Sequence, residues 1–131
     1  MGWRLAKSLE VLRDQINTLA PGRARGWDGS IGDASHQARK SDHDPDADGV
    51  VHAIDVTHDP KRGCDANVLT EALRKGKDSR LKYCIWNGRI FSSLVSPWKW
   101  RVYNGASKHD HHMHVSVMDE GADDTRAWKL T

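Results

Sequence analysis

The chain has 131 residues, 29% of them charged, and a formal net charge of +2, so it can bury one hydrophobic core and we expect a single domain over residues 1–131. The small net charge gives no support for nucleic-acid binding, and no apolar run is long enough to cross a bilayer. The first residues lack the apolar stretch and cleavage site of a secretory signal, so we expect the protein to be made and folded in a cytoplasm. We also expect it to be a monomer.

Apolar residues recur at helical spacing from Leu5 to Leu19, which predicts an amphipathic helix that ends at the Pro21–Gly22 breaker. Residues 22–49 are rich in Gly, Asp, Ser, Arg and His and show no periodicity. A loop of that length in a compact domain is usually functional or disordered. Residues 50–56 are β-branched and apolar, as is typical of an interior strand.

A second helix is predicted from an N-cap at Asp65 to Gly76. Residues 82–86 and 89–91 flank Asn87–Gly88, the strongest short hairpin signal, and the final strand is predicted at 112–117. These elements predict an α+β fold, in which a small, mostly antiparallel sheet is packed by two helices. The cysteines, Cys64 and Cys84, are expected to be free thiols in a reducing compartment, with a bridge as the alternative.

Residues 108–117 contain four of the eight histidines, namely His109, His111, His112 and His114. Imidazole is the commonest side-chain ligand for a first-row metal. Alternate residues of a strand share a face, so His112 and His114 should project together. A catalytic zinc site uses about three protein ligands and leaves one position to water, so further ligands must come from elsewhere in the chain.

Asp55 is the informative upstream residue, because it lies within the apolar segment 50–56. Burying a lone carboxylate there would be costly, and a cation beside it removes that cost. His43 lies in the loop before this segment. His43, Asp55 and His114 are therefore the candidate metal ligands, with His36 as an alternative to His43. His52 and His58 are expected to be structural or exposed.

Three motifs resemble the clan of zinc peptidases named for lysostaphin, D-Ala-D-Ala carboxypeptidases and hedgehog: Ser41-x-His43, Gly49-x-x-x-Ala53-x-Asp55 and His112-x-His114. The resemblance spans roughly residues 28–117 and implies that His43, Asp55 and His114 bind one Zn²⁺ per chain, on the face of the sheet. Relative to the family pattern, residues 44–48 are inserted between His43 and Asp55. The loop must therefore bulge if both side chains are to reach one ion.

The carboxypeptidase branch of this clan has a carboxylate, the general base, three residues before the last ligand, where this chain has His111. The pattern His109-x-x-His112-x-His114 resembles the penicillin-insensitive murein endopeptidases instead. That resemblance implies His112 as the base and His109 as its assistant. The strand geometry agrees, since His112 shares a face with His114 and can reach a metal-bound water.

The function implied by the resemblance is a single-domain zinc peptidase that hydrolyses a peptide bond in the stem or cross-bridge of peptidoglycan. The expected partners are stem peptides, and the expected setting is a phage or prophage endolysin that stays in the host cytoplasm until it is released to the wall. The bond cut, the host wall and the choice between endopeptidase and D,D- or L,D-carboxypeptidase stay open. The alternative is a catalytically inactive, zinc-containing binding module of the same fold, as in hedgehog.

Other polar and aromatic residues are candidates for substrate binding: Arg39, Ser41, Trp98, Trp100, Tyr103 and Asn104. Aromatic residues on strands more often belong to the core. A Ca²⁺ site at Asp44, Asp46 and Asp48 is a further possibility, because Asp-x-Asp-x-Asp-Gly opens EF-hand loops. That motif also requires a bidentate Glu and flanking helices, whereas a strand is predicted to follow here.

Overall fold

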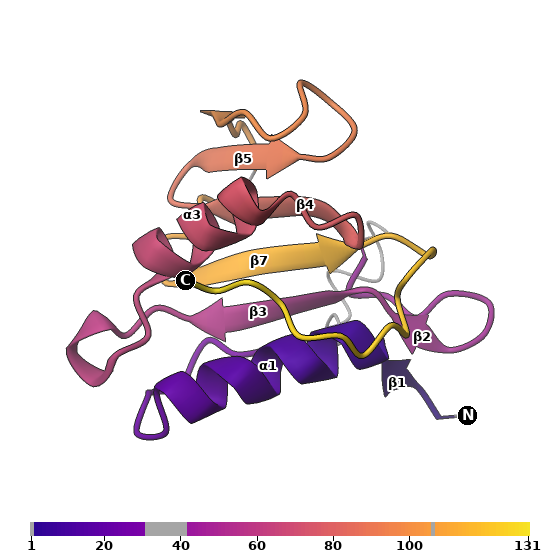
Figure 1. Cartoon of the computed structure of the whole chain (residues 1–131), viewed down its shortest axis with the longest axis horizontal. Helices are drawn as coiled ribbons and strands as arrows, with labels where there is room; N and C mark the ends of the chain where they lie inside the picture. Colours follow the sequence, from indigo (N-terminus) through magenta and orange to yellow (C-terminus); the bar gives the residue numbers. More distant parts are fainter. Residues whose placement is uncertain (1, 31–41, 106) are drawn as a thin grey trace.

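The computed structural model describes residues 2–30, 42–105 and 107–131 (Figure 1). A five-stranded sheet has the order β3-β7-β4-β5-β6, and all its neighbouring strands are antiparallel. The described residues form two α-helices, α1 (Lys7–Leu19) and α3 (Ala66–Gly76), and one 3-10 turn, η1 (Pro60–Arg62). The strands of the sheet are β3 (Ala53–Thr57), β4 (Leu81–Trp86), β5 (Arg89–Ser92), β6 (Arg101–Val102) and β7 (His112–Val117). The predicted α+β architecture is confirmed.

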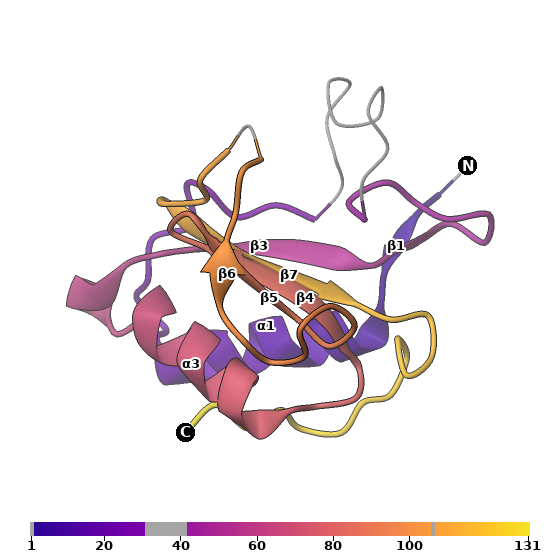
Figure 2. The same cartoon turned by 90° about the horizontal axis from the view of Figure 1, so that it is seen from above.

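Both helices lie on one face of this sheet, and the segments 22–30, 42–49, 103–105 and 107–111 lie on the other (Figure 2). The alternation along the central strand β7 explains the division. Met113 and Val115 are fully buried members of the hydrophobic core under the helices. His112 and His114 alternate with them and therefore point to the loop-bearing face. The sheet thus separates a hydrophobic core from a histidine-rich surface.

Helix α1 begins later than the apolar spacing predicts. Arg4–Leu5 form strand β1, which pairs in parallel with β2 (Val50–Val51), and this pairing keeps the first residues extended. The helix then buries its apolar stripe, Leu9, Leu12 and Ile16, against the sheet. It ends at Leu19, before Pro21, as predicted. The hydrogen bond from the Ala20 N–H to the Ile16 carbonyl closes its last turn.

The predicted cap of α3 and the predicted hairpin are confirmed. The Asp65 carboxylate accepts the backbone N–H of Asn67, which satisfies one free donor of the first turn. The helix ends at Gly76 as predicted, but the residue in the left-handed conformation that closes it is Lys77 (φ 48°) rather than the glycine. Asn87 (φ 52°) and Gly88 (φ 78°) both have positive φ, as the tight turn between β4 and β5 requires.

The predicted strand 50–56 is divided at His52 into β2 and β3. His52 donates its backbone N–H to the Asp42 carbonyl, and its own carbonyl accepts from the Val117 N–H. These bonds hold the end of the preceding loop beside the end of β7. The loop that carries His43 is thereby fixed to the sheet.

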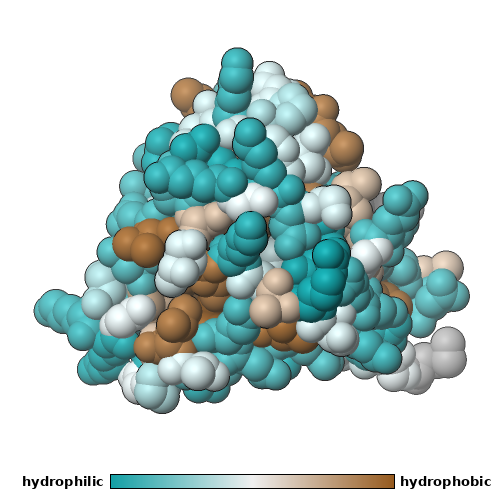
Figure 3. All heavy atoms as spheres, viewed as in Figure 1, coloured by the Kyte–Doolittle hydropathy of each residue, from teal (hydrophilic) through white to brown (hydrophobic). Residues whose placement is uncertain are grey.

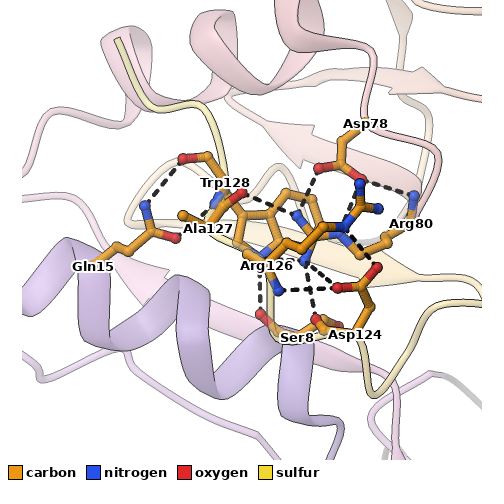
Figure 4. A network of polar contacts seen from close by, with 8 residues as sticks. All are labelled: Ser8, Gln15, Asp78, Arg80, Asp124, Arg126, Ala127 and Trp128. Carbon is orange, nitrogen blue, oxygen red and sulfur yellow. Dashed lines mark hydrogen bonds and ion pairs between the residues drawn. The ribbon is translucent and has the colours of Figure 1, made fainter.

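The C-terminal segment is attached to the helix-bearing face by a buried arginine (Figure 4). Arg80 is only 2% exposed; it forms an ion pair with Asp78 and donates to the carbonyls of Asp124 and Arg126. Its guanidinium carbon lies 4.1 Å from the Trp128 ring centroid. The Trp128 indole in turn donates to the Ser8 carbonyl of α1. The network connects the two ends of the chain, and no sequence motif predicted it.

Hydrophilic residues cover most of the helix-bearing face, with hydrophobic residues in smaller patches (Figure 3). Within the described ranges, no helix has the length and hydropathy needed to span a bilayer. Cys64 and Cys84 are both buried free thiols, as expected.

Candidate metal centre

Three predicted ligands converge on the loop-bearing face of the sheet. His43 Nε2 lies 3.1 Å from His114 Nδ1 and 3.2 Å from Asp55 Oδ2, and His114 Nδ1 lies 3.2 Å from Asp55 Oδ1. In a tetrahedral zinc site with bonds of about 2.0–2.1 Å, neighbouring ligand atoms are about 3.3 Å apart. The three side chains therefore approach one another at distances close to those between zinc ligands, with His43 and His114 facing different oxygens of the Asp55 carboxylate.

The sheet register explains how two of these residues meet. Asp55 of β3 and His114 of β7 are directly opposed in the antiparallel pair, so their side chains project from the same face. The neighbours of Asp55, Ile54 and Val56, point into the core. The apolar segment that made Asp55 conspicuous in the sequence is thus the strand that places it opposite His114.

His43 reaches the pair because the inserted residues form a compact turn. The Asp46 carboxylate accepts the backbone N–H groups of Asp48 and Val50, and the Asp46 N–H donates to the Val50 carbonyl. The turn takes up the extra length between His43 and Asp55. The spacing that departs from the family pattern is therefore compatible with a shared ion.

The ring nitrogens turned away from the centre are also engaged. His43 Nδ1 lies 2.7 Å from the Ser30 carbonyl, which can only accept, so this nitrogen carries a proton. His114 Nε2 lies 2.7 Å from Ser116 Oγ. Metal-binding histidines almost always use their second nitrogen in this way, which directs the other lone pair at the ion.

The charges also favour a cation between these groups. Burial would raise the pKa of Asp55, but His114 and His43 hold it well below its usual range. Burial would lower the pKa of His43, but the Asp55 carboxylate raises it instead. Two imidazoles and a carboxylate so close together need a shared positive charge, and this donor set suits a divalent ion such as zinc.

His112 and His109, the predicted base and its assistant, lie beside the three ligands. His112 Nε2 is 3.6 Å from Asp55 Oδ2, and its Nδ1 is buried without a hydrogen-bond partner in the described part of the chain. The His109 ring centroid lies 4.9 Å from that of His112 and 5.6 Å from that of His114. Asp55, His109 and His112 form a second group of converging ligand atoms.

Burial shifts the acid–base behaviour of both residues. It lowers the pKa of His112, with Asp55 opposing the shift. It lowers the pKa of His109 to about 4, with His114 and His112 adding to the effect. His109 Nδ1 lies 3.0 Å from the Ser107 carbonyl and carries the proton there, so its Nε2 is an acceptor in the neutral ring.

Two aromatic residues at the centre were missed in the sequence. Trp27 is 53% exposed and stacks on His111, with ring centroids 4.6 Å apart and planes 10° apart. Its backbone N–H donates to Thr57 Oγ1, which keeps it next to β3. Tyr83 of β4 stacks on His114, with centroids 5.2 Å apart and planes 9° apart. Only one signal pointed to Trp27, namely an aromatic residue inside a ligand-rich loop.

The structure brings only part of the predicted substrate-binding set to the centre. The Tyr103 ring lies 5.8 Å from that of His109, and Asn104 is exposed just after it. Trp98 and Trp100 are not brought there, because both rings contact the buried Phe91. The Trp100 indole also donates to Glu71 of α3, on the helix-bearing face. Arg39, Ser41 and His36 lie outside the described residues.

The remaining histidines have structural contacts. His58 Nδ1 accepts the backbone N–H of Ala66 at the start of α3. His52 is buried, and its Nε2 lies 3.0 Å from the Asp119 carboxylate. Both arrangements agree with the expectation that these residues are structural.

The three aspartates predicted as a calcium site do not converge. In the described ranges, no group of converging ligand atoms contains two of Asp44, Asp46 and Asp48. The Asp46 carboxylate is used by the backbone of its own turn and faces His52 and Asp119, and Asp48 is exposed. Strand β2 follows where an EF-hand would continue as a helix. The EF-hand reading is therefore wrong.

A groove of about 650 Å³ lies at the C-terminal end of β7, where Val117 and Met118 line it, and none of His43, Asp55 and His114 is part of its lining. Its lining includes the carboxylates of Asp42, Asp46 and Asp119 and the ammonium group of Lys82.

Comparisons of the chain with protein-family models, with curated proteins and with solved structures find no match.

Proposed function

We propose that the chain is a zinc-dependent peptidase that hydrolyses a peptide bond in the stem or cross-bridge of peptidoglycan. One observation carries the proposal: His43, Asp55 and His114 converge at ligand spacing, with two further histidines beside them. A structural metal site does not need proton acceptors beyond its ligands, whereas a hydrolytic site needs one as a general base. The motifs shared with wall peptidases support peptidoglycan as the substrate and phage-encoded wall lysis as the setting.

In this proposal His43 Nε2, His114 Nδ1 and the Asp55 carboxylate hold one zinc ion. Three protein ligands leave a coordination position for water, as in catalytic rather than structural zinc sites. When bound, zinc supplies Lewis-acid chemistry, lowering the pKa of a water and polarising the scissile carbonyl.

His112 is the proposed general base. It lies on the same face of β7 as His114, next to the Asp55 carboxylate. A proton taken from the attacking water can pass from the His112 ring to the leaving amine nitrogen. His109 assists as an acceptor through Nε2, because its Nδ1–H is committed to the Ser107 carbonyl. In its neutral form His109 therefore orients the water rather than stabilising an oxyanion.

The test combines metal content with cleavage. Purified protein should contain about one equivalent of zinc, and His114→Ala should lose it, whereas the matched variant His58→Gln, outside the centre, should keep it. Incubation with purified peptidoglycan should release new amino termini, and a chelator should stop the release. Intact zinc binding without cleavage of peptidoglycan of any wall type would exclude the enzyme and favour the inactive binding module.

A further inference from the structure

One row of cross-strand neighbours runs from the candidate metal ligands to the far edge of the sheet. The row crosses all five strands and consists of Asp55, His114, Ile85, Ile90 and Arg101. Directly opposed residues of antiparallel strands project from the same face of a sheet. Arg101 therefore lies on the loop-bearing face, together with the candidate centre, whereas its neighbour Trp100 packs against the core.

The two isoleucines of the row form an apolar strip between the centre and Arg101. Ile85 is buried but is not part of the hydrophobic core under the helices, whereas its neighbours Cys84 and Trp86 are. Ile90 is partly buried. Neighbouring strands lie about 4.8 Å apart, so the Cα of Arg101 is about 14 Å from that of His114.

The Arg101 guanidinium lacks a carboxylate partner. Its Nε is buried and has no hydrogen-bond partner in the described part of the chain, although the side chain as a whole is partly exposed. The buried arginines Arg23 and Arg80, by contrast, each form an ion pair with an aspartate. A buried N–H group without an acceptor costs free energy. A carboxylate from a ligand would remove that cost, because it matches the planar fork of a guanidinium.

Aromatic rings connect the centre with this edge of the sheet. The His109 ring lies 5.6 Å from that of His114 and 5.8 Å from that of Tyr103, which follows Arg101 by two residues. The Tyr103 backbone N–H donates to the Gly88 carbonyl at the turn between β4 and β5. An extended peptide advances about 3.3–3.6 Å per residue. A peptide cleaved at the metal and lying along these rings would therefore reach Arg101 within about four residues of the scissile bond.

We propose that Arg101 binds a free carboxylate of the stem peptide and is a specificity-determining residue of the peptidase. The inference rests on the proposed function for its substrate. Stem peptides carry free carboxylates at the isoglutamyl residue and at the carboxyl terminus. A carboxypeptidase holds the terminal carboxylate only one residue from the scissile bond. The separation between Arg101 and His114 therefore favours an endopeptidase.

The test compares soluble stem peptides of one sequence, in which the isoglutamyl α-carboxylate, the terminal carboxylate or neither is amidated. Amidation of the group that Arg101 binds should lower kcat/KM of the wild type by about 10–100-fold, mainly through KM, because a charged hydrogen bond is lost. The peptide that shows this loss identifies which carboxylate is bound.

Variants of Arg101 show whether this residue reads the carboxylate. Arg101→Gln should show the same loss on the free peptide and no further loss on the amidated one, and Arg101→Lys should recover part of it. Arg89→Gln is the matched control and should cleave like the wild type, because Arg89 lies on the opposite face, over the Trp100 ring. Equal losses in Arg101→Gln on free and amidated peptides, or no effect of amidation on the wild type, would overturn the inference.

Calorimetric binding of the same peptides to the zinc-free chain separates this inference from the proposed function. A wild type that binds no zinc or cleaves no peptidoglycan removes the proposed function. Tighter binding of the free peptide than of the amidated one, with the difference lost in Arg101→Gln, still supports the carboxylate site. Equal binding of the two peptides, or no binding of either, overturns it.

Discussion

Three kinds of residue surround the candidate centre, and each does something different. His43, Asp55 and His114 offer ligand atoms at 3.1–3.2 Å spacing. His112 and His109 lie next to these three candidate ligands and are not part of the ligand set. Trp27 provides an exposed aromatic surface through its stack on His111. Loss of a ligand, a base and a wall of the site should therefore have distinguishable effects.

His112→Ala should abolish most peptidoglycan cleavage, because a positioned general base contributes about 10²–10⁴-fold to rate. Its zinc content should stay near one equivalent, since His112 is not among the three proposed ligands. Cleavage rate and zinc content are measured on the same preparation. Full activity in the variant would remove His112 from the base role.

Trp27→Ala should weaken substrate binding, because an exposed aromatic face beside the histidines offers a large apolar contact. We expect the Michaelis constant for wall fragments to rise by about tenfold, as loss of roughly 1.4 kcal/mol of aromatic contact predicts. Trp27→Phe should recover part of the effect. An unchanged Michaelis constant together with a lower maximal rate would show that Trp27 acts on the histidines instead of on the substrate.

At the scale of elements, the loop after α1 is attached to β3 by a buried ion pair. Asp28 forms a bidentate pair with the buried Arg23 and accepts from the backbone and hydroxyl of Thr57. Burial would raise the pKa of Asp28, but Arg23 and Thr57 outweigh it and lower the pKa below 3.8. The stabilisation is therefore fully present above that pH and is lost as the pH falls through the folded-state pKa.

Asp28→Asn should lower the free energy of unfolding by about 3 kcal/mol at pH 7, because it leaves the Arg23 charge buried and uncompensated. The difference from wild type should begin to shrink below about pH 4, where the Asp28 carboxylate of the unfolded chain takes up a proton, and should be lost as the pH falls through the lower folded-state pKa. Urea unfolding at pH 7 and pH 3 measures both values, with the exposed Asp48→Asn as control. An equal difference at the two pH values would contradict this assignment.

The sequence predicted elements that depend on local pattern and missed contacts made across the fold. The Asp65 cap, the Asn87–Gly88 turn and the strand face shared by His112 and His114 all follow from a few neighbouring residues. The ring stacks of Trp27 and Tyr83 join segments far apart in the chain, so no residue spacing in the sequence predicted them.

Trp98 and Trp100 were predicted as substrate-binding residues but do not lie at the candidate centre. Both tryptophans alternate with polar residues in the sequence, but such alternation does not specify which side of the sheet the aromatic rings join. Only Arg101–Val102 form a strand, and the two rings pack on Phe91. The alternating pattern is consistent with packing of the two rings, and they pack against the hydrophobic core rather than beside the candidate metal ligands.

At the scale of the whole molecule, the sheet holds a core on one face and the candidate centre on the other. The ends of the chain stabilise the core face, where Arg80 joins the C-terminal carbonyls and Trp128 while Trp128 bonds to α1. The centre on the far face has no part in that network. Stability and metal binding should therefore be separable by mutation.

Arg80→Met should lower the free energy of unfolding by about 3 kcal/mol, because it removes a buried charge whose partners remain. Zinc affinity of the folded variant should not change. Urea unfolding and chelator competition on one preparation check both statements. A large loss of zinc affinity in fully folded protein would show that the two faces are coupled.

The most direct measurement of the central claim is zinc K-edge X-ray absorption on the full chain loaded with one equivalent of zinc. Ligation by His43, Asp55 and His114 predicts nitrogen and oxygen neighbours at about 2.0–2.1 Å, with imidazole outer-shell scattering and no sulfur. The same spectrum should be lost in His114→Ala. A sulfur neighbour at about 2.3 Å would place the ion at a cysteine and contradict the proposed centre.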